Sequence, residues 1–194
     1  MALLDVITYG NPTLRKVAQP YEPGEITADF IRDMVETMRA KDGVGLAAPQ
    51  VNVSKRFIVA SDLENTYILI NPVIAAFSER VVRDKEGCLS IPGFQADVQR
   101  YEKVVVKAQN ERGEQIELKA DGLLARVLQH EIDHLNGVLY IDRSEPDTFV
   151  QLNIREDGEE EKVSASPEKL KRYFRSVNSG LEDLVFDPVE AVRL

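Results

Sequence analysis

Gln129-His130-Glu131-Ile132-Asp133-His134-Leu135-Asn136-Gly137 is the stretch of sequence that decides the fold. It ends a predicted helix that runs from about Asp121 to Asn136, with Gly137 as the stop signal. Apolar residues surround most of the helix, which is typical of a buried helix: Leu123, Leu124, Ala125, Val127, Leu128, Ile132 and Leu135. Polar side chains inside such a helix are costly unless they are paired or bind a metal. We therefore expect this helix to carry a functional site.

The two histidines of the chain, His130 and His134, both lie in this stretch. Residues four apart share one face of a helix, so both imidazoles can reach a single metal ion. Glu131 lies beside the first of them, where it can act as a base toward a metal-bound water. A catalytic site normally has three protein ligands and one open position. The sequence must therefore supply a third ligand from elsewhere.

Three sources of that third ligand are considered. The third histidine of the longer pattern HExxHxxGxxH is replaced by Tyr140, which is not a plausible ligand in its place. An acidic ligand from the C-terminal region, for instance Glu156, would fit a metalloprotease. The single cysteine, Cys88, is the remaining candidate. The residue types alone leave the last two open.

Composition narrows the class of protein. The 194 residues suit one domain, or one domain with a tail, and 43% of them are hydrophobic, as in a globular protein. The net charge of −9 argues against a nucleic-acid partner, and no apolar run approaches a membrane span. A single cysteine excludes an internal disulfide framework and fits a reducing compartment. We see no targeting signal and expect a cytoplasmic protein, or an organellar one if a leader has been removed.

The remaining pattern predicts an α+β fold with mostly antiparallel strands packed around the central buried helix. Another helix is predicted from Thr27 to about Lys41, and a hairpin turn at 110–113. Short strands are predicted at 56–60, 67–70, 73–77, 103–108 and 115–118. We divide the chain into a catalytic domain, residues 1–145, and a C-terminal extension, residues 146–194. The extension is expected to hold an acidic loop at 155–162 and a helix starting at Ser166.

Three segments in this order resemble the signature motifs of the peptide deformylases. They are Gly43-Val44-Gly45-Leu46-Ala47-Ala48-Pro49-Gln50, then Glu86-Gly87-Cys88-Leu89-Ser90, and then the stretch 129–137. The resemblance covers about residues 5 to 145. Each motif alone is weak or moderate as a signal, but the three together are highly specific. The resemblance implies a metal-dependent hydrolase of protein biosynthesis, which removes the N-formyl group from N-terminal formylmethionine of nascent polypeptides and releases formate.

The resemblance also assigns roles to residues. Cys88, His130 and His134 would hold one divalent ion, generally Fe²⁺ in this family, with Zn²⁺, Ni²⁺ or Co²⁺ able to take its place. The water on that ion would attack the formyl carbon while Glu131 serves as general base and then acid. The side-chain amide of Gln50 and the backbone N–H of Leu89 would stabilise the oxyanion.

Substrate binding is likewise implied rather than derived. Relatives bind an extended peptide by strand addition to the Gly45 region. We expect the methionine pocket and backbone contacts to involve Val44, Gly45, Gly87, Leu123 and Val127. Arg126 is expected at the pocket rim or paired with an acid, and Glu86 is expected to pair with Arg100.

Two departures from the family pattern matter. Some relatives carry an arginine that contacts the substrate backbone, and Gln95 stands nearest to it here, so the sequence does not decide whether Gln95 or Arg126 touches substrate. The extension does not match the simple C-terminal helix of well-known bacterial forms. Transient ribosome association is a partner that the family suggests, but the contacts made by that helix cannot be carried over.

Two other functions compete with the deformylase interpretation. An HExxH metalloprotease would use a Glu or Asp as third ligand and cleave internal peptide bonds. A non-catalytic metal protein would need a closed site or the loss of its base. The presence of Glu131 and Gln50 argues against that loss.

Overall fold

The computed structural model describes residues 2–22, 24–155, 157–178 and 184–188. Its helices are α1 (Ala28–Ala40), α2 (Gly122–Leu135) and α3 (Pro167–Val177). Its strands are β1 (Gly45–Ala47), β2 (Phe57–Ser61), β3 (Thr66–Phe77), β4 (Val81–Cys88), β5 (Ile91–Tyr101), β6 (Lys103–Gln109), β7 (Gln115–Asp121), β8 (Val150–Ile154) and β9 (Glu160–Ser164). Among the described helices, none is long and apolar enough to cross a bilayer.

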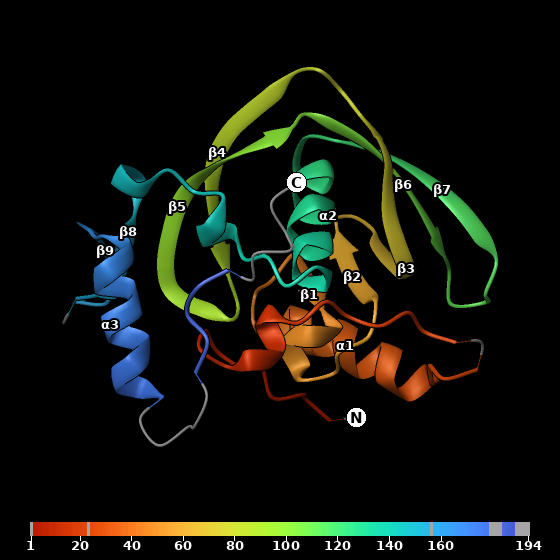
Figure 1. Cartoon of the computed structure of the whole chain (residues 1–194), viewed down its shortest axis with the longest axis horizontal. Helices are drawn as coiled ribbons and strands as arrows, with labels where there is room; N and C mark the ends of the chain where they lie inside the picture. The colour runs from red at the N-terminus through yellow and green to blue at the C-terminus, as the bar shows by residue number, and fades with distance from the viewer. Residues whose placement is uncertain (1, 23, 156, 179–183, 189–194) are drawn as a thin grey trace.

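The strands form two antiparallel sheets. One has the order β1-β2-β3-β6-β7 and the other the order β4-β5-β8-β9. Helix α2 runs between the two sheets (Figure 1), and the N-terminal segment with α1 covers one end. The expected α+β fold with antiparallel strands around the central helix is confirmed.

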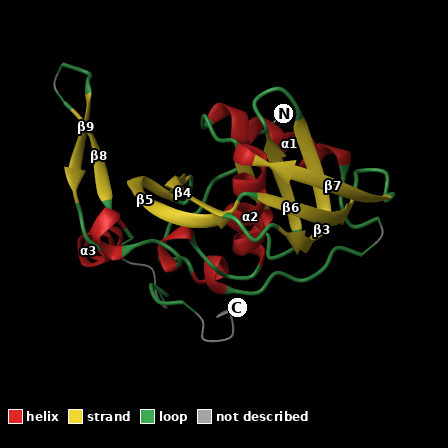
Figure 2. Ribbon diagram, turned by 90° about the horizontal axis from the view of Figure 1, so that it is seen from above, coloured by secondary structure: helices red, strands yellow, loops and turns green. Residues whose placement is uncertain are grey.

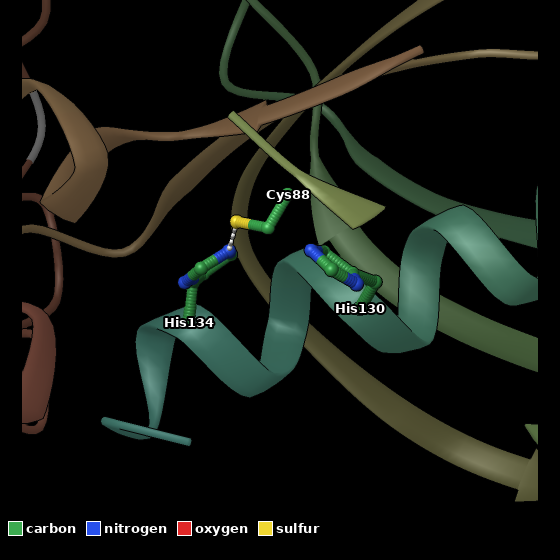
Figure 3. A group of neighbouring side chains, drawn as sticks. All are labelled: Cys88, His130 and His134. Atoms are coloured by element: carbon green, nitrogen blue, oxygen red, sulfur yellow. Dashed lines mark hydrogen bonds between the residues drawn. The ribbon is translucent and has the colours of Figure 1, made fainter. Parts of the chain in front are cut away.

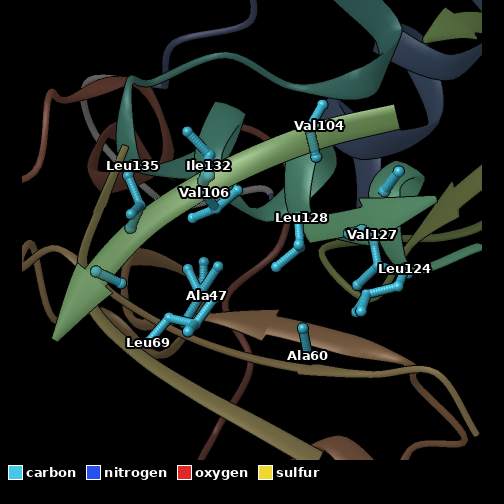
Figure 4. Packing of buried hydrophobic residues seen from close by; sticks show 14 of the residues in the cluster. Ala47, Ala60, Leu69, Val104, Val106, Leu124, Val127, Leu128, Ile132 and Leu135 are labelled. Atoms are coloured by element: carbon cyan, nitrogen blue, oxygen red, sulfur yellow. The ribbon is translucent and has the colours of Figure 1, made fainter. Parts of the chain in front are cut away.

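Helix α2 is buried because its apolar side chains fill the concave face of the five-stranded sheet. Figure 4 shows Leu124, Leu128 and Ile132 among side chains of the facing strands, including Val104 and Val106. The predicted stop at Gly137 is also confirmed. This residue has φ of 73°, and a Cβ there would lie 2.6 Å from the carbonyl oxygen of Arg15. Only glycine meets both conditions without strain.

The two strands predicted at 67–70 and 73–77 are a single strand, β3, with an irregularity in its middle. The pairing register with β6 shifts between Ile70 and Val73. Asn71 has φ of 52°, and its side chain accepts from the Tyr21 N–H (2.9 Å) and donates to the Tyr21 carbonyl (3.0 Å). The prediction depended on two apolar runs, which Asn71 and Pro72 separate, whereas the bulge lets one strand continue through them.

Part of the expected acidic loop is a strand, so the prediction for 155–162 was wrong at its C-terminal end. Strand β9 begins at Glu160 and pairs with β8 in a hairpin that projects beside β5 (Figure 2). Its side chains are exposed or half-buried, and the strand depends on backbone pairing rather than on an apolar face. A run of charged residues gives no period-two signal to read.

The C-terminal region is packed onto the rest of the protein. Strand β8 pairs with β5, through Phe94 with Gln151 and Gln95 with Val150. The helix start predicted at Ser166 is confirmed, since its side chain accepts from the Lys169 N–H (3.2 Å). Two side chains of α3, Leu170 and Phe174, are buried in a cluster that also holds Tyr9 and Phe94.

Candidate metal centre

Three possible metal ligands converge where α2 passes the end of β4. Cys88 Sγ and ring nitrogens of His130 and His134 all lie within 4.8 Å of one another. The two histidines leave α2 on one face, one turn apart, and point toward the thiol (Figure 3). Cys88 Sγ is 3.3 Å from His134 Nε2. Ligand atoms around one tetrahedral ion stand about 3.5 Å apart, since each bond is about 2.0 to 2.3 Å long.

The donor set fits a divalent transition metal. A thiolate and two imidazoles suit Fe²⁺, Zn²⁺, Ni²⁺ and Co²⁺, and they leave one position free, as catalytic sites require. The sequence also raised Glu156 and Tyr140 for the third position. Glu156 lies outside the described residues, and the hydroxyl of Tyr140 donates to the Phe94 carbonyl at 3.0 Å. The Tyr140 ring stacks on the ring of His130, with centroids 6.1 Å apart.

His130 is held by Glu86, two residues before Cys88. Its Nδ1 is 2.9 Å from Glu86 Oε2, which leaves Nε2 available for a metal. Burial alone would raise the pKa of Glu86, but hydrogen bonds from His130 and Arg100 hold that pKa well below its ordinary value. The hydrogen bond from Nδ1 to the Glu86 carboxylate orients the imidazole and sets its tautomer.

Two arginines neutralise Glu86. Arg100 binds it through Nε to Oε1 (2.9 Å) and Nη2 to Oε2 (3.0 Å), so the predicted ion pair is confirmed. Arg126 donates from Nη1 to Glu86 Oε1 at 2.7 Å, which confirms the expectation that it pairs with an acid. Arg126 also donates to the carbonyls of Val98 (3.0 Å) and Val82 (2.8 Å). It thereby ties α2 to both strands of the β4–β5 pair.

Glu131 points into the site from the same turn of α2. The side chain is buried, and Oε2 has no hydrogen-bond partner within the described part of the chain. Burial raises the pKa of Glu131 to about 7. A carboxyl group with an unpartnered oxygen and a pKa near neutrality is suited to accept and return one proton.

Gln50 also contacts the thiol. Its Oε1 accepts from the Ala47 N–H (2.8 Å), which turns the amide nitrogen toward Cys88. From there Nε2 donates to Cys88 Sγ (3.4 Å) and to Ser90 Oγ (3.2 Å). The amide nitrogen therefore lies beside Cys88, with its N–H groups directed to the thiol and to Ser90.

A cavity of about 700 Å³ opens onto this group. The five expected substrate-binding residues all line it: Val44, Gly45, Gly87, Leu123 and Val127. Leu89, Gln95 and Arg126 line it as well. Leu123 is 43% exposed, whereas Val127 is buried and also contacts the apolar core. The structure brings these residues together, and their roles toward a substrate stay predictions.

Sequence reasoning missed several residues that line the same cavity, among them two after α1 and two in the C-terminal region. Lys41 and Asp42 follow the end of α1, and Leu152 and Glu160 belong to the β8–β9 hairpin. None of them stands in a motif. The pairing of β8 with β5 brings the hairpin to the cavity, and no local sequence pattern predicts that pairing.

Comparison with known proteins agrees with this geometry. The polypeptide deformylase family model matches residues 3–149. The peptide deformylase of Carboxydothermus hydrogenoformans is 49% identical over 148 residues, which cover 75% of this chain and 95% of that relative.

Two solved structures add detail. A peptide deformylase from Synechococcus elongatus in complex with actinonin is 36% identical with a TM-score of 0.72, covering 96% of this chain and 91% of its own. A Met-Ala-Ser-bound class I type b peptide deformylase from Acinetobacter baumannii is 36% identical with a TM-score of 0.69, covering 73% of this chain and 98% of its own.

Proposed function

The chain belongs to the peptide deformylase family, and from this premise we propose which residues remove the N-formyl group from formylmethionyl peptides. The enzyme is a metal-dependent hydrolase that releases formate. Cys88, His130 and His134 hold one divalent ion. When bound, such an ion lowers the pKa of a coordinated water and polarises the formyl oxygen.

The protein groups divide the remaining work. Glu131 takes the proton of the attacking water and delivers it to the leaving amine nitrogen. The amide of Gln50 and the N–H of Leu89 donate to the oxygen on which negative charge develops. The methionine side chain enters the apolar end of the cavity at Leu123 and Val127.

One observation carries this proposal. The three ligand residues converge beside a buried carboxyl group, Glu131, that has an unpartnered oxygen, at the wall of a cavity large enough for a peptide. A structural metal site would have four protein ligands, and a metal site that has lost its catalytic activity would lack the base.

The native ion is proposed to be Fe²⁺, because the family generally uses it. The donor set itself also accepts Zn²⁺, Ni²⁺ and Co²⁺. A thiolate–iron site is sensitive to oxidation, which fits a reducing compartment and a bacterial-type enzyme of the cytoplasm. Transient ribosome association is proposed only because the substrate is a nascent chain.

Purification under anaerobic conditions with Fe²⁺, followed by measurement of formate release from formyl-Met-Ala-Ser, tests the function. We expect turnover that depends on the metal. Protein with a filled metal site that releases no formate would refute the proposal.

A further inference from the structure

The cavity continues beyond the metal ligands to the β8–β9 hairpin. Its wall includes Gly93 and Gln95 of β5 and then Leu152 and Glu160 of the hairpin. The carbonyl oxygen of Leu152 lies 3.8 Å from the position of a Cβ on Gly93, so the two strands meet without a gap. The hairpin therefore extends the side of the cavity that β5 begins.

Strand pairing shows which face of the hairpin is turned to the cavity. Residues paired across antiparallel strands share a face, and so do residues two apart along one strand. Gln95 pairs with Val150, Leu152 with Lys162, and Ile154 with Glu160. One face thus carries Gln95, Val150, Leu152, Ile154, Glu160 and Lys162.

The opposite face serves a different purpose. It carries Phe94, which is buried against Phe174 of α3. Gln151, Asn153, Glu161 and Val163 belong to this second face by the same register. The hairpin is thus anchored at its base through one face while the other stays open to the cavity.

The open face has an unusual composition for a structural element. Leu152 is half-buried and lines the cavity, and Ile154, which shares its face but does not line the cavity, is 73% exposed. Glu160 makes no ion pair within the described residues, and Lys162, although on this face, does not line the cavity. Of the other charged residues that line the cavity, Lys85 pairs with Asp97 and Arg126 pairs with Glu86, while Lys41 and Asp42 have opposite charges. Glu160 therefore gives the far end of the cavity a negative charge.

We propose that this face binds the third to fifth residues of the formylated peptide, with Leu152 and Ile154 contacting apolar side chains and Glu160 favouring basic ones. The inference rests on the proposed function, because only a peptide whose formyl group reaches the metal ligands sends its later residues along this wall. The family model matches residues 3–149 and ends before the hairpin, so the hairpin lies outside the segment that carries the metal ligands and the base.

Two matched variants test the proposal. Glu160→Lys changes the charge on the open face, and Glu161→Lys makes the same change one residue away on the opposite face. Each is assayed on formyl-Met-Ala, and on formyl-Met-Ala-Ser extended by two lysines or by two glutamates. The ratio of kcat/KM for the lysine and glutamate peptides measures the preference.

We expect the wild-type protein to favour the lysine peptide by about two- to five-fold, the size of an exposed ion pair. Glu160→Lys should reverse that ratio through KM, with kcat unchanged, and Glu161→Lys should leave it near the wild-type value. In 0.5 M salt the preference should fall, because exposed charges are screened. Leu152→Ala should lower kcat/KM only for a peptide extended by two leucines.

The result that overturns the inference is an unchanged ratio in Glu160→Lys, or an equal change in Glu161→Lys. Either would mean that the hairpin face does not contact the peptide. Formyl-Met-Ala is too short to reach the hairpin and should be hydrolysed equally by all variants. Lack of formate from every peptide would instead count against the proposed function.

Discussion

Glu131 packs directly on the backbone of Gly45. A Cβ at position 45 would lie 2.8 Å from Cδ and 2.9 Å from Cγ of Glu131, closer than real Cβ atoms approach their neighbours. The glycine of the first motif is therefore required by the carboxyl group of the third, independently of any peptide that strand β1 binds.

Gly45→Ala is accordingly expected to displace Glu131 from the site. We predict a fall in kcat of at least about 100-fold, the usual contribution of a positioned general base. Metal content should stay near one ion per chain, because the ligands are not displaced. Gly87→Ala is a useful comparison, since a Cβ there meets nothing closer than 3.5 Å and should cost much less. Equal losses in both variants would contradict the explanation.

Glu131→Gln tests the base itself. The amide keeps the shape of the side chain but cannot accept and return the proton, so kcat should drop by about 10² to 10⁴-fold. Metal analysis and the unfolding midpoint should match those of the wild-type protein. Unchanged turnover would remove Glu131 from the role of base.

Cys88→Ala separates the deformylase from a metalloprotease with an acidic third ligand. The thiolate is expected to be essential, so the variant should lose both bound metal and formate release. The measurement is metal stoichiometry after dialysis, together with turnover. If metal and activity both survived, a carboxylate such as Glu156 would have to be the ligand.

Glu86→Gln tests the support of His130. The glutamine still fits but no longer fixes the imidazole tautomer through a negative charge. We expect metal affinity to fall by about 10- to 100-fold, measured by competition with a chelator. Loss of the ionised partner of Arg100 should also lower the free energy of unfolding, by about 3 kcal/mol. Unchanged metal affinity would show that Glu86 serves to pair with Arg100 and Arg126 and not to orient His130.

A contact between two site residues can be predicted from the sequence only when the residues are close along the chain. The shared face of His130 and His134 follows from helix geometry alone. The approach of Cys88 does not, because it is 42 residues before His130 and no spacing rule spans two sheets. Cys88 was predicted as a ligand only from the resemblance to a family. The arginine partners of Glu86 and the packing of Glu131 on Gly45 are seen only in the folded structure.

The strands were predicted where short runs are apolar and rich in Ile and Val, or where apolar and polar residues alternate. Strand β4 is exposed over most of its length, and β9 carries charged residues, so neither has an apolar period. Both are strands because their backbones pair with neighbours that were themselves placed by tertiary packing. The wall formed by Leu152 and Glu160 could not be predicted for the same reason.

The packing of the C-terminal region against Tyr9 should affect the stability of the protein at alkaline pH. Burial raises the pKa of Tyr9 to about 12, and the hydroxyl donates to the carbonyl oxygen of Phe186. The folded protein thus keeps the phenol proton above pH 10, where the unfolded chain releases it. Stability is therefore full below pH 10 and is lost as the pH rises from 10 toward 12.

Tyr9→Phe should remove this part of the alkaline loss, on the order of 2 kcal/mol between pH 9 and pH 12. At pH 8 the variant should be less stable by about 1 kcal/mol, because the carbonyl of Phe186 loses its donor. Urea unfolding at pH 8, 10 and 11.5 measures both effects. Tyr21→Phe serves as the comparison. Burial also raises the pKa of Tyr21 to about 12, so this variant should remove a similar alkaline loss of stability. Its ring packs near Phe57, away from the C-terminal region, so the Phe186 carbonyl keeps its donor. A Tyr9→Phe protein with the full wild-type alkaline slope would show that Tyr9 is not buried by the C-terminal segment in solution.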